Sequence, residues 1–129
     1  MWIEVTPSFP EELRPSLETH VRQCLPFECA GLIVISEGRT WAMALPIMAS
    51  AMGFAVEPSA WIEMLTSLHR RGIEIWATYH SHPGGQLRPS GRDDALRWTS
   101  KRLLLLAPFG EQVAIAQYEW TAPSDHRSS

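Results

Sequence analysis

Residues 80 to 93 read HSHPGGQLRPSGRD, a stretch with two histidines, two serines and an aspartate in close order. The preceding residues, IEIWATYH (73–80), alternate in polarity and predict a β-strand that ends at His80. His80 and His82 stand two positions apart, and side chains so spaced lie on one face of a strand, about 6–7 Å apart. Two imidazoles at that separation can converge on one zinc ion, so the stretch predicts a metal site at the end of the strand.

Asp93 completes the predicted ligand set, because its carboxylate follows a loop long enough to fold back over the ion. Three protein ligands leave the fourth tetrahedral position for water, as in catalytic zinc sites. Zinc lowers the pKa of such a water towards about 7. The proton needs a carrier that is not a ligand, and Glu28, in LPFECAGLIVI (25–35), is our candidate general acid/base. Ser90 is a candidate donor to the oxyanion of a tetrahedral intermediate.

Each of these residues also has a purely structural interpretation. Two strand histidines can simply cap a core, and Glu28 alone is an ordinary acid ahead of a strand. Ser90 and Asp93 have the spacing of a capping box, so we expect Ser90 to be a helix N-cap whatever its other role. The metal interpretation is favoured because His80 and His82 occur together with Ser90 and Asp93.

The same residues resemble the JAB1/MPN/Mov34 metalloproteases, also called the JAMM or MPN-plus family. The pattern of that family is an upstream Glu, then His-x-His-Pro, with seven residues between the second His and a Ser, and an Asp three positions after that Ser. The chain matches with Glu28 in PFECAGL, His80-Ser81-His82-Pro83, Ser90 and Asp93, and the resemblance extends over roughly residues 9 to 118. The family spacing selects Asp93 over Asp94. One departure is Ala77, where the family usually has Gly, and we interpret it as a change in packing.

The resemblance implies a cytidine-deaminase-like α/β fold, a zinc cofactor and hydrolysis of amide or isopeptide bonds. It implies that His80, His82 and Asp93 bind the metal and that Glu28 and Ser90 are catalytic. The chain resembles the compact prokaryotic branch, whose members act on ubiquitin-like sulfur-carrier proteins and cleave after their terminal Gly-Gly. Two alternatives remain: a phage-tail or cell-wall peptidase, and a non-catalytic MPN scaffold module. Nucleoside deamination is disfavoured, because the chain lacks an H-x-E…P-C-x-x-C signature.

The rest of the chain predicts a single α/β domain around a mixed, mostly antiparallel sheet flanked by helices, over residues 1–120, with a disordered tail at 121–129. Helices are predicted from Ser8 or Pro10 to Cys24, from Pro58 to Arg71 and from Ser90 to Trp98. Pro15 is tolerable in the first of these only within its first turn. Strands are predicted at 2–6, 31–36, 40–47, 53–56, 73–80, 102–107 and 112–120, with a turn at 108–110.

Composition excludes several classes of function. The 11 basic and 14 acidic residues are spread along the 129-residue chain, so no nucleic-acid-binding patch is expected. No stretch approaches the roughly 20 apolar residues of a membrane helix, and the N-terminus lacks the features of a signal peptide, so we expect a cytoplasmic protein. Cys24 and Cys29 are expected to be small buried hydrophobes and not a disulfide, and no Cys-x-x-Cys pair or Cys/His ladder indicates a structural zinc site. His20 and His69 are expected on the surface.

Overall fold

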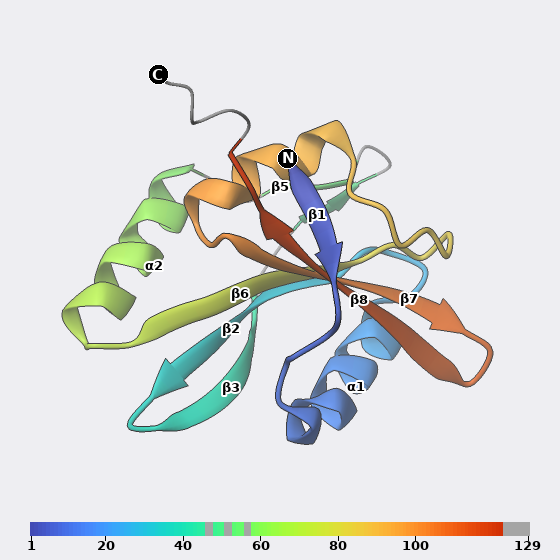
Figure 1. Ribbon diagram of the computed structural model, residues 1–129, viewed down its shortest axis with the longest axis horizontal. Coiled ribbons are helices and arrows are strands. Elements are labelled where there is room, and N and C mark those ends of the chain that lie inside the picture. Colours follow the sequence, from blue (N-terminus) through green and yellow to red (C-terminus); the bar gives the residue numbers. More distant parts are fainter. Residues whose placement is uncertain (46–47, 51–52, 56–57, 123–129) are drawn as a thin grey trace.

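Six strands form one mixed sheet in the computed structural model, which describes residues 1–45, 48–50, 53–55 and 58–122 (Figure 1). The strand order is β1-β8-β7-β6-β2-β3. The strands are β1 (Trp2–Val5), β2 (Ala30–Ser36), β3 (Arg39–Ala44), β6 (Glu74–Ser81), β7 (Arg102–Phe109) and β8 (Gln112–Trp120). A separate hairpin pairs β4 (Met48–Ser50) with β5 (Gly53–Ala55). The helical elements are η1 (Glu11–Leu13), α1 (Arg14–Cys24), α2 (Pro58–Arg70) and η2 (Gly91–Trp98).

The central pair, β6 and β7, is parallel, while the other neighbours in this sheet are antiparallel. A parallel pair needs a crossover connection, and here residues 82–101, with the 3₁₀ helix η2, provide it. The run Leu103–Leu106 in β7 is fully buried, because helices cover both faces of the sheet there. The crossover therefore leaves the sheet at the C-terminal end of β6, where the predicted histidines lie.

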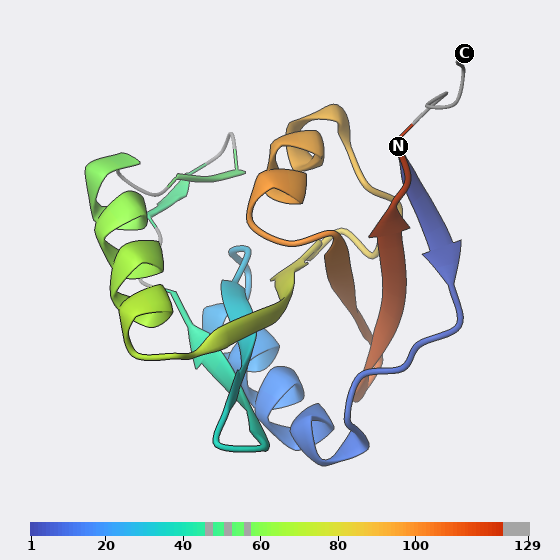
Figure 2. The ribbon, with the colours of Figure 1, turned by 60° about the vertical axis from the view of Figure 1, so that its left-hand side comes forward.

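Helices cover both faces of the sheet, as can be followed in Figure 2. On one face, Leu17 and Val21 of α1 pack in one buried cluster with Leu104. On the other face, α2 packs over Leu32 and η2 lies over Leu105. His80 pairs with Leu105 and with Ala30, so it belongs to the face covered by α2 and η2.

The structure confirms the α/β class and most of the predicted elements. Helix α1 begins at Arg14, which puts Pro15 in its first turn, as required. Strand β7 continues to Phe109, so the turn predicted at 108–110 lies instead at Gly110 and Glu111, and the strand predicted at 40–47 ends at Ala44. Residues 46–47, Val56 and the tail from 123 lie outside the described residues. No helix in the described ranges is long and apolar enough to cross a membrane.

Gly31 is required by the packing of the central strands. A Cβ atom at this position would lie 2.3 Å from Cζ of Tyr79, whose ring is buried. We predict that Gly31→Ala destabilises the fold by about 1–3 kcal/mol, because the confined ring must shift. Gly84→Ala, where a Cβ meets nothing within 4 Å, is the matched control. Urea unfolding of the two variants checks this, and equal midpoints would contradict it.

Candidate metal centre

Three potential ligand atoms meet where β6 ends. His80 is the second-last residue of β6, His82 follows the strand, and Asp93 lies in η2. Nε2 of His80 lies 3.1 Å from Nε2 of His82 and 3.1 Å from Oδ1 of Asp93. All three ligand atoms lie within 4.8 Å of one another. The structure thus brings together the three residues that the sequence singles out as ligands.

The donor set fits a zinc ion in both chemistry and spacing. Two imidazole nitrogens and a carboxylate oxygen are ordinary zinc ligands. In a tetrahedron with bonds of about 2.0–2.1 Å, ligand atoms lie about 3.3 Å apart. The two 3.1 Å separations around His80 are close to that edge length. Small movements of the side chains would therefore suffice to bind the ion.

Asp93 is held as an anion at this position. Burial alone would raise the pKa of its carboxyl, but the hydrogen bond and charge of His80, with the Ser90 amide and His82, hold the pKa below its usual value. Its Oδ2 accepts a hydrogen bond from the Ser90 amide at 2.7 Å, while Oδ1 faces His80. The capping and ligand interpretations of Asp93 are therefore compatible, because each uses a different oxygen.

Backbone contacts set the position of His82. Its amide donates to the Leu106 carbonyl at 2.8 Å, which extends the pairing of β6 with β7 past the end of the strand. Its Nδ1 lies 2.7 Å from the Gln86 carbonyl oxygen. Because a carbonyl only accepts, Nδ1 carries the proton in this contact and Nε2 is left as the ligand atom.

Glu28 lies in the segment between α1 and β2, just before the strand that pairs with β6. It is two residues before Ala30, which pairs with His80 in β6. The Ser81 amide donates to the Cys29 carbonyl at 3.0 Å, and the Cys29 amide donates to Ser81 Oγ at 2.8 Å. These two bonds hold the Glu28 segment against the backbone between the two histidines. Ser90 is exposed at the start of η2 and contacts Asp93 through its amide.

Three supporting residues were not singled out by sequence reasoning: Trp2, Ser81 and Gln86. The indole Nε1 of Trp2 donates to the Asp93 carbonyl oxygen at 3.2 Å, across the sheet edge. Nothing in the N-terminal sequence indicates that contact. Ser81 lies between the two histidines of the motif, and this position could have indicated its supporting role. Gln86 contacts His82 through its main-chain oxygen, and the identity of its side chain gives no indication of such a contact.

We predict that Trp2→Phe weakens zinc binding roughly tenfold, because the backbone carrying Asp93 loses its buried donor while the aromatic packing is kept. A competition titration against a chromogenic chelator measures the affinity. Trp98→Phe is the control, since that ring is 79% exposed. Equal zinc affinities of Trp2→Phe and the wild type would contradict a positioning role for Trp2.

Comparisons with known proteins agree with this fold. The chain matches the family of prokaryotic homologs of the JAB domain over residues 10–122. It is 34% identical over 71 residues to a probable TtuB-protein conjugate cleaving protease of Thermus thermophilus, a match that covers 48% of this chain and 48% of that relative.

Two solved structures are similar in fold. One is the solution structure of a protein from Desulfitobacterium hafniense, with a TM-score of 0.54, 18% identity, and coverage of 83% of this chain and 79% of that one. The other is a JAB1/MPN domain protein from Archaeoglobus fulgidus, with a TM-score of 0.53, 20% identity, and coverage of 80% and 82%. At these identities they show the fold alone. The family match spans most of the described residues, and the chain belongs to the prokaryotic JAB-domain family.

Proposed function

We propose that the chain is a zinc-dependent peptidase or isopeptidase that hydrolyses the amide bond after the C-terminal Gly-Gly of a ubiquitin-like or sulfur-carrier protein. The observation that carries the proposal is the convergence of His80, His82 and Asp93 at the end of β6. The name of the Thermus relative, a protease that cleaves TtuB-protein conjugates, supports the substrate class.

The three ligands would hold the metal by the atoms that already face one another. Zinc bound there would supply Lewis-acid polarisation of the scissile carbonyl and activation of a water molecule. The burial of His80 and Asp93 restricts their rotamers, so the ligand geometry is largely set before metal arrives. Little reorganisation is then required on binding.

Glu28 and Ser90 would perform the steps that need a proton or a donor. Glu28 is partly buried, so its carboxylate remains accessible for proton transfer, and it is not one of the three ligands. In this account it takes a proton from the attacking water and delivers it to the departing amine. The exposed hydroxyl of Ser90 donates a hydrogen bond to the carbonyl oxygen as negative charge develops there.

The substrate would be an extended tail and not a folded surface. A Gly-Gly terminus lacks side chains, so its backbone can approach the metal and the β6 terminus closely. Main-chain hydrogen bonds to a strand would hold such a tail in register.

A fusion substrate tests the proposal. Zinc-loaded protein is incubated with the host's ubiquitin-like sulfur carriers, each extended by a short peptide past Gly-Gly, and the products are identified by mass spectrometry. We expect cleavage after the second Gly. An extended carrier in which Ala-Ala replaces Gly-Gly is the control for selectivity towards that bond. Zinc-loaded protein that cuts cell-wall peptides and spares every carrier would contradict the substrate class. Protein that cuts neither would contradict the enzymatic function.

A further inference from the structure

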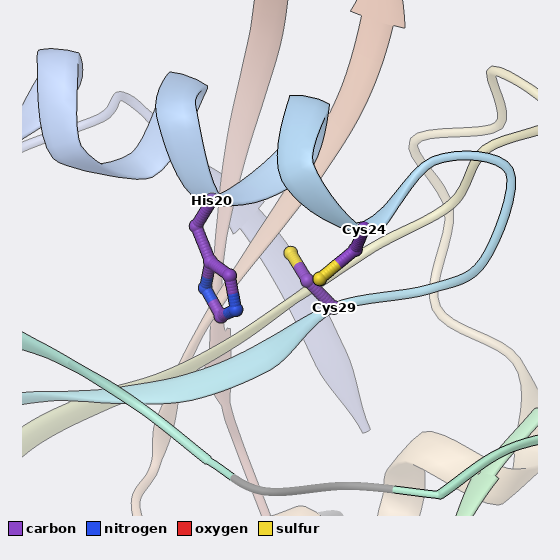
Figure 3. A group of neighbouring side chains, drawn as sticks. All are labelled: His20, Cys24 and Cys29. Atoms are coloured by element: carbon purple, nitrogen blue, oxygen red, sulfur yellow. The ribbon is translucent and has the colours of Figure 1, made fainter.

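A second group of side chains that could hold a metal ion lies on the opposite face of the sheet (Figure 3). It consists of His20 and Cys24 from α1 and Cys29 just before β2. One ligand atom from each residue lies within 4.8 Å of the other two. Figure 3 shows the imidazole and both sulfur atoms turned into the space between the helix and the strand. Within the described residues, this is the one such group besides the centre at β6.

The fold brings these three residues together for a simple reason. His20 and Cys24 are four positions apart and so share one face of α1. The chain then reverses through residues 25–28, so that Cys29 enters the sheet beneath the same face. Cys29 is fully buried, and Cys24 is partly buried against the same core cluster.

We propose that His20, Cys24 and Cys29 form a second metal site, which binds a thiophilic cation such as Zn²⁺. Thiolates and imidazoles are common zinc ligands, whereas Mg²⁺ and Ca²⁺ bind oxygen ligands. The site differs from the centre at β6 in its sulfur donors. It also lies under α1, whereas the other centre lies on the face covered by α2 and η2.

The surroundings of His20 suit a ligand. Its Nδ1 lies 2.7 Å from the Tyr79 hydroxyl, and the two rings pack edge to face. With the proton on Nδ1, that nitrogen donates to the hydroxyl oxygen and the lone pair of Nε2 is left for a cation. Burial lowers the pKa of His20, which favours the neutral imidazole that metals bind.

The surroundings of Cys29 suit a thiol that loses its proton only to a metal. Burial raises the pKa of Cys29 to about 11, so its thiol is unreactive at neutral pH. A bound cation displaces the protons of both thiols, and each becomes a thiolate ligand. A cleft of about 390 Å³, lined by His20, Gln23, Ala42 and Tyr79 among others, opens beside His20.

A cation at this site would tie the last turn of α1 to the start of β2. The segment between the two cysteines contains Glu28, and Cys29 is bonded through its backbone to Ser81. The cation would therefore restrain the segment that carries the proposed general acid/base. This consequence rests on the proposed function, whereas the metal site itself does not.

Cobalt substitution distinguishes the two sites. Metal-stripped protein, kept reduced with a non-thiol reductant, is titrated with Co²⁺, and absorption is followed in the near ultraviolet. A thiolate-to-cobalt charge-transfer band requires coordination by sulfur. The centre at β6 contains no thiol, so the band reports cobalt at the second site alone. We expect the band in the wild type, its loss in Cys24→Ser, and its retention in Asp93→Asn. Zinc content should be two ions per wild-type chain and one in each variant.

The controls keep the result independent of hydrolysis and of misfolding. Circular dichroism verifies that Cys24→Ser is folded, and His20→Gln provides a second variant in which the band should weaken. Absence of the sulfur band from reduced wild-type protein whose β6 centre has taken up cobalt would overturn the proposal. A band that persists unchanged in Cys24→Ser would overturn it as well. Neither result depends on whether any substrate is cleaved.

Discussion

Replacing Glu28 by Gln should reduce hydrolysis about 10²–10⁴-fold, the range for loss of a general acid/base. The amide has nearly the shape of the carboxylate but cannot accept the proton of the attacking water. Zinc content should be unchanged, because the ligand atoms that meet at β6 come from His80, His82 and Asp93. Single-turnover cleavage of the extended carrier, with zinc measured on the same samples, gives both quantities.

A second glutamate controls for the change of charge. Glu12→Gln makes the same substitution at an exposed position in η1 and should leave turnover unaltered. If Glu28→Gln turns over at the wild-type rate with its zinc in place, Glu28 is not the proton carrier. If it loses zinc and activity together, its role is in metal binding and the assignment fails as well.

Asp93→Asn should lose both the zinc of the β6 centre and hydrolysis while preserving the start of η2. The amide oxygen of Asn can still accept from the Ser90 amide, so the cap that Oδ2 now makes at 2.7 Å is retained. The anionic ligand atom beside His80 is lost, and we expect zinc affinity at the β6 centre to fall roughly a hundredfold or more. Zinc competition and cleavage assays on the folded variant measure this.

Asp94→Asn is the matched control for that variant. Asp94 is the next residue in the same first turn, and its side chain is exposed. It should retain zinc and activity. The reverse outcome, with zinc lost in Asp94→Asn and kept in Asp93→Asn, would show that the ligand assignment is wrong.

Sequence reasoning predicted the parts of the fold that local patterns control. The β-branched and apolar run at 31–36 became β2, and the requirement that Pro15 stand in the first turn was met by a helix that begins at Arg14. The ligands could be predicted from the motif because strand periodicity places His80 and His82 on one face. The family match over residues 10–122 confirms the resemblance that the motif suggested.

Contacts between distant segments could not be predicted from local patterns. The expectation that His20 lies on the surface is wrong: its ring is partly buried and contacts Tyr79, 59 positions away. The bond from Trp2 to Asp93 joins residues 91 positions apart and depends on the edge pairing of β1 with β8. The turn expected at 108–110 is displaced to Gly110 and Glu111, because β8 pairs with β7 as far as Phe109, and this pairing between strands outweighs the turn preference of Pro108.

The most direct test of the central claim is metal removal and restoration in the cleavage assay. Wild-type protein is stripped with a chelator, verified as free of zinc, and assayed on the extended carrier before and after zinc is returned. Our account predicts no cleavage by the stripped protein and recovery when zinc is added, with no recovery in His80→Ala. Undiminished cleavage by zinc-free protein, or full recovery in His80→Ala, would contradict a catalytic zinc ion held by His80, His82 and Asp93.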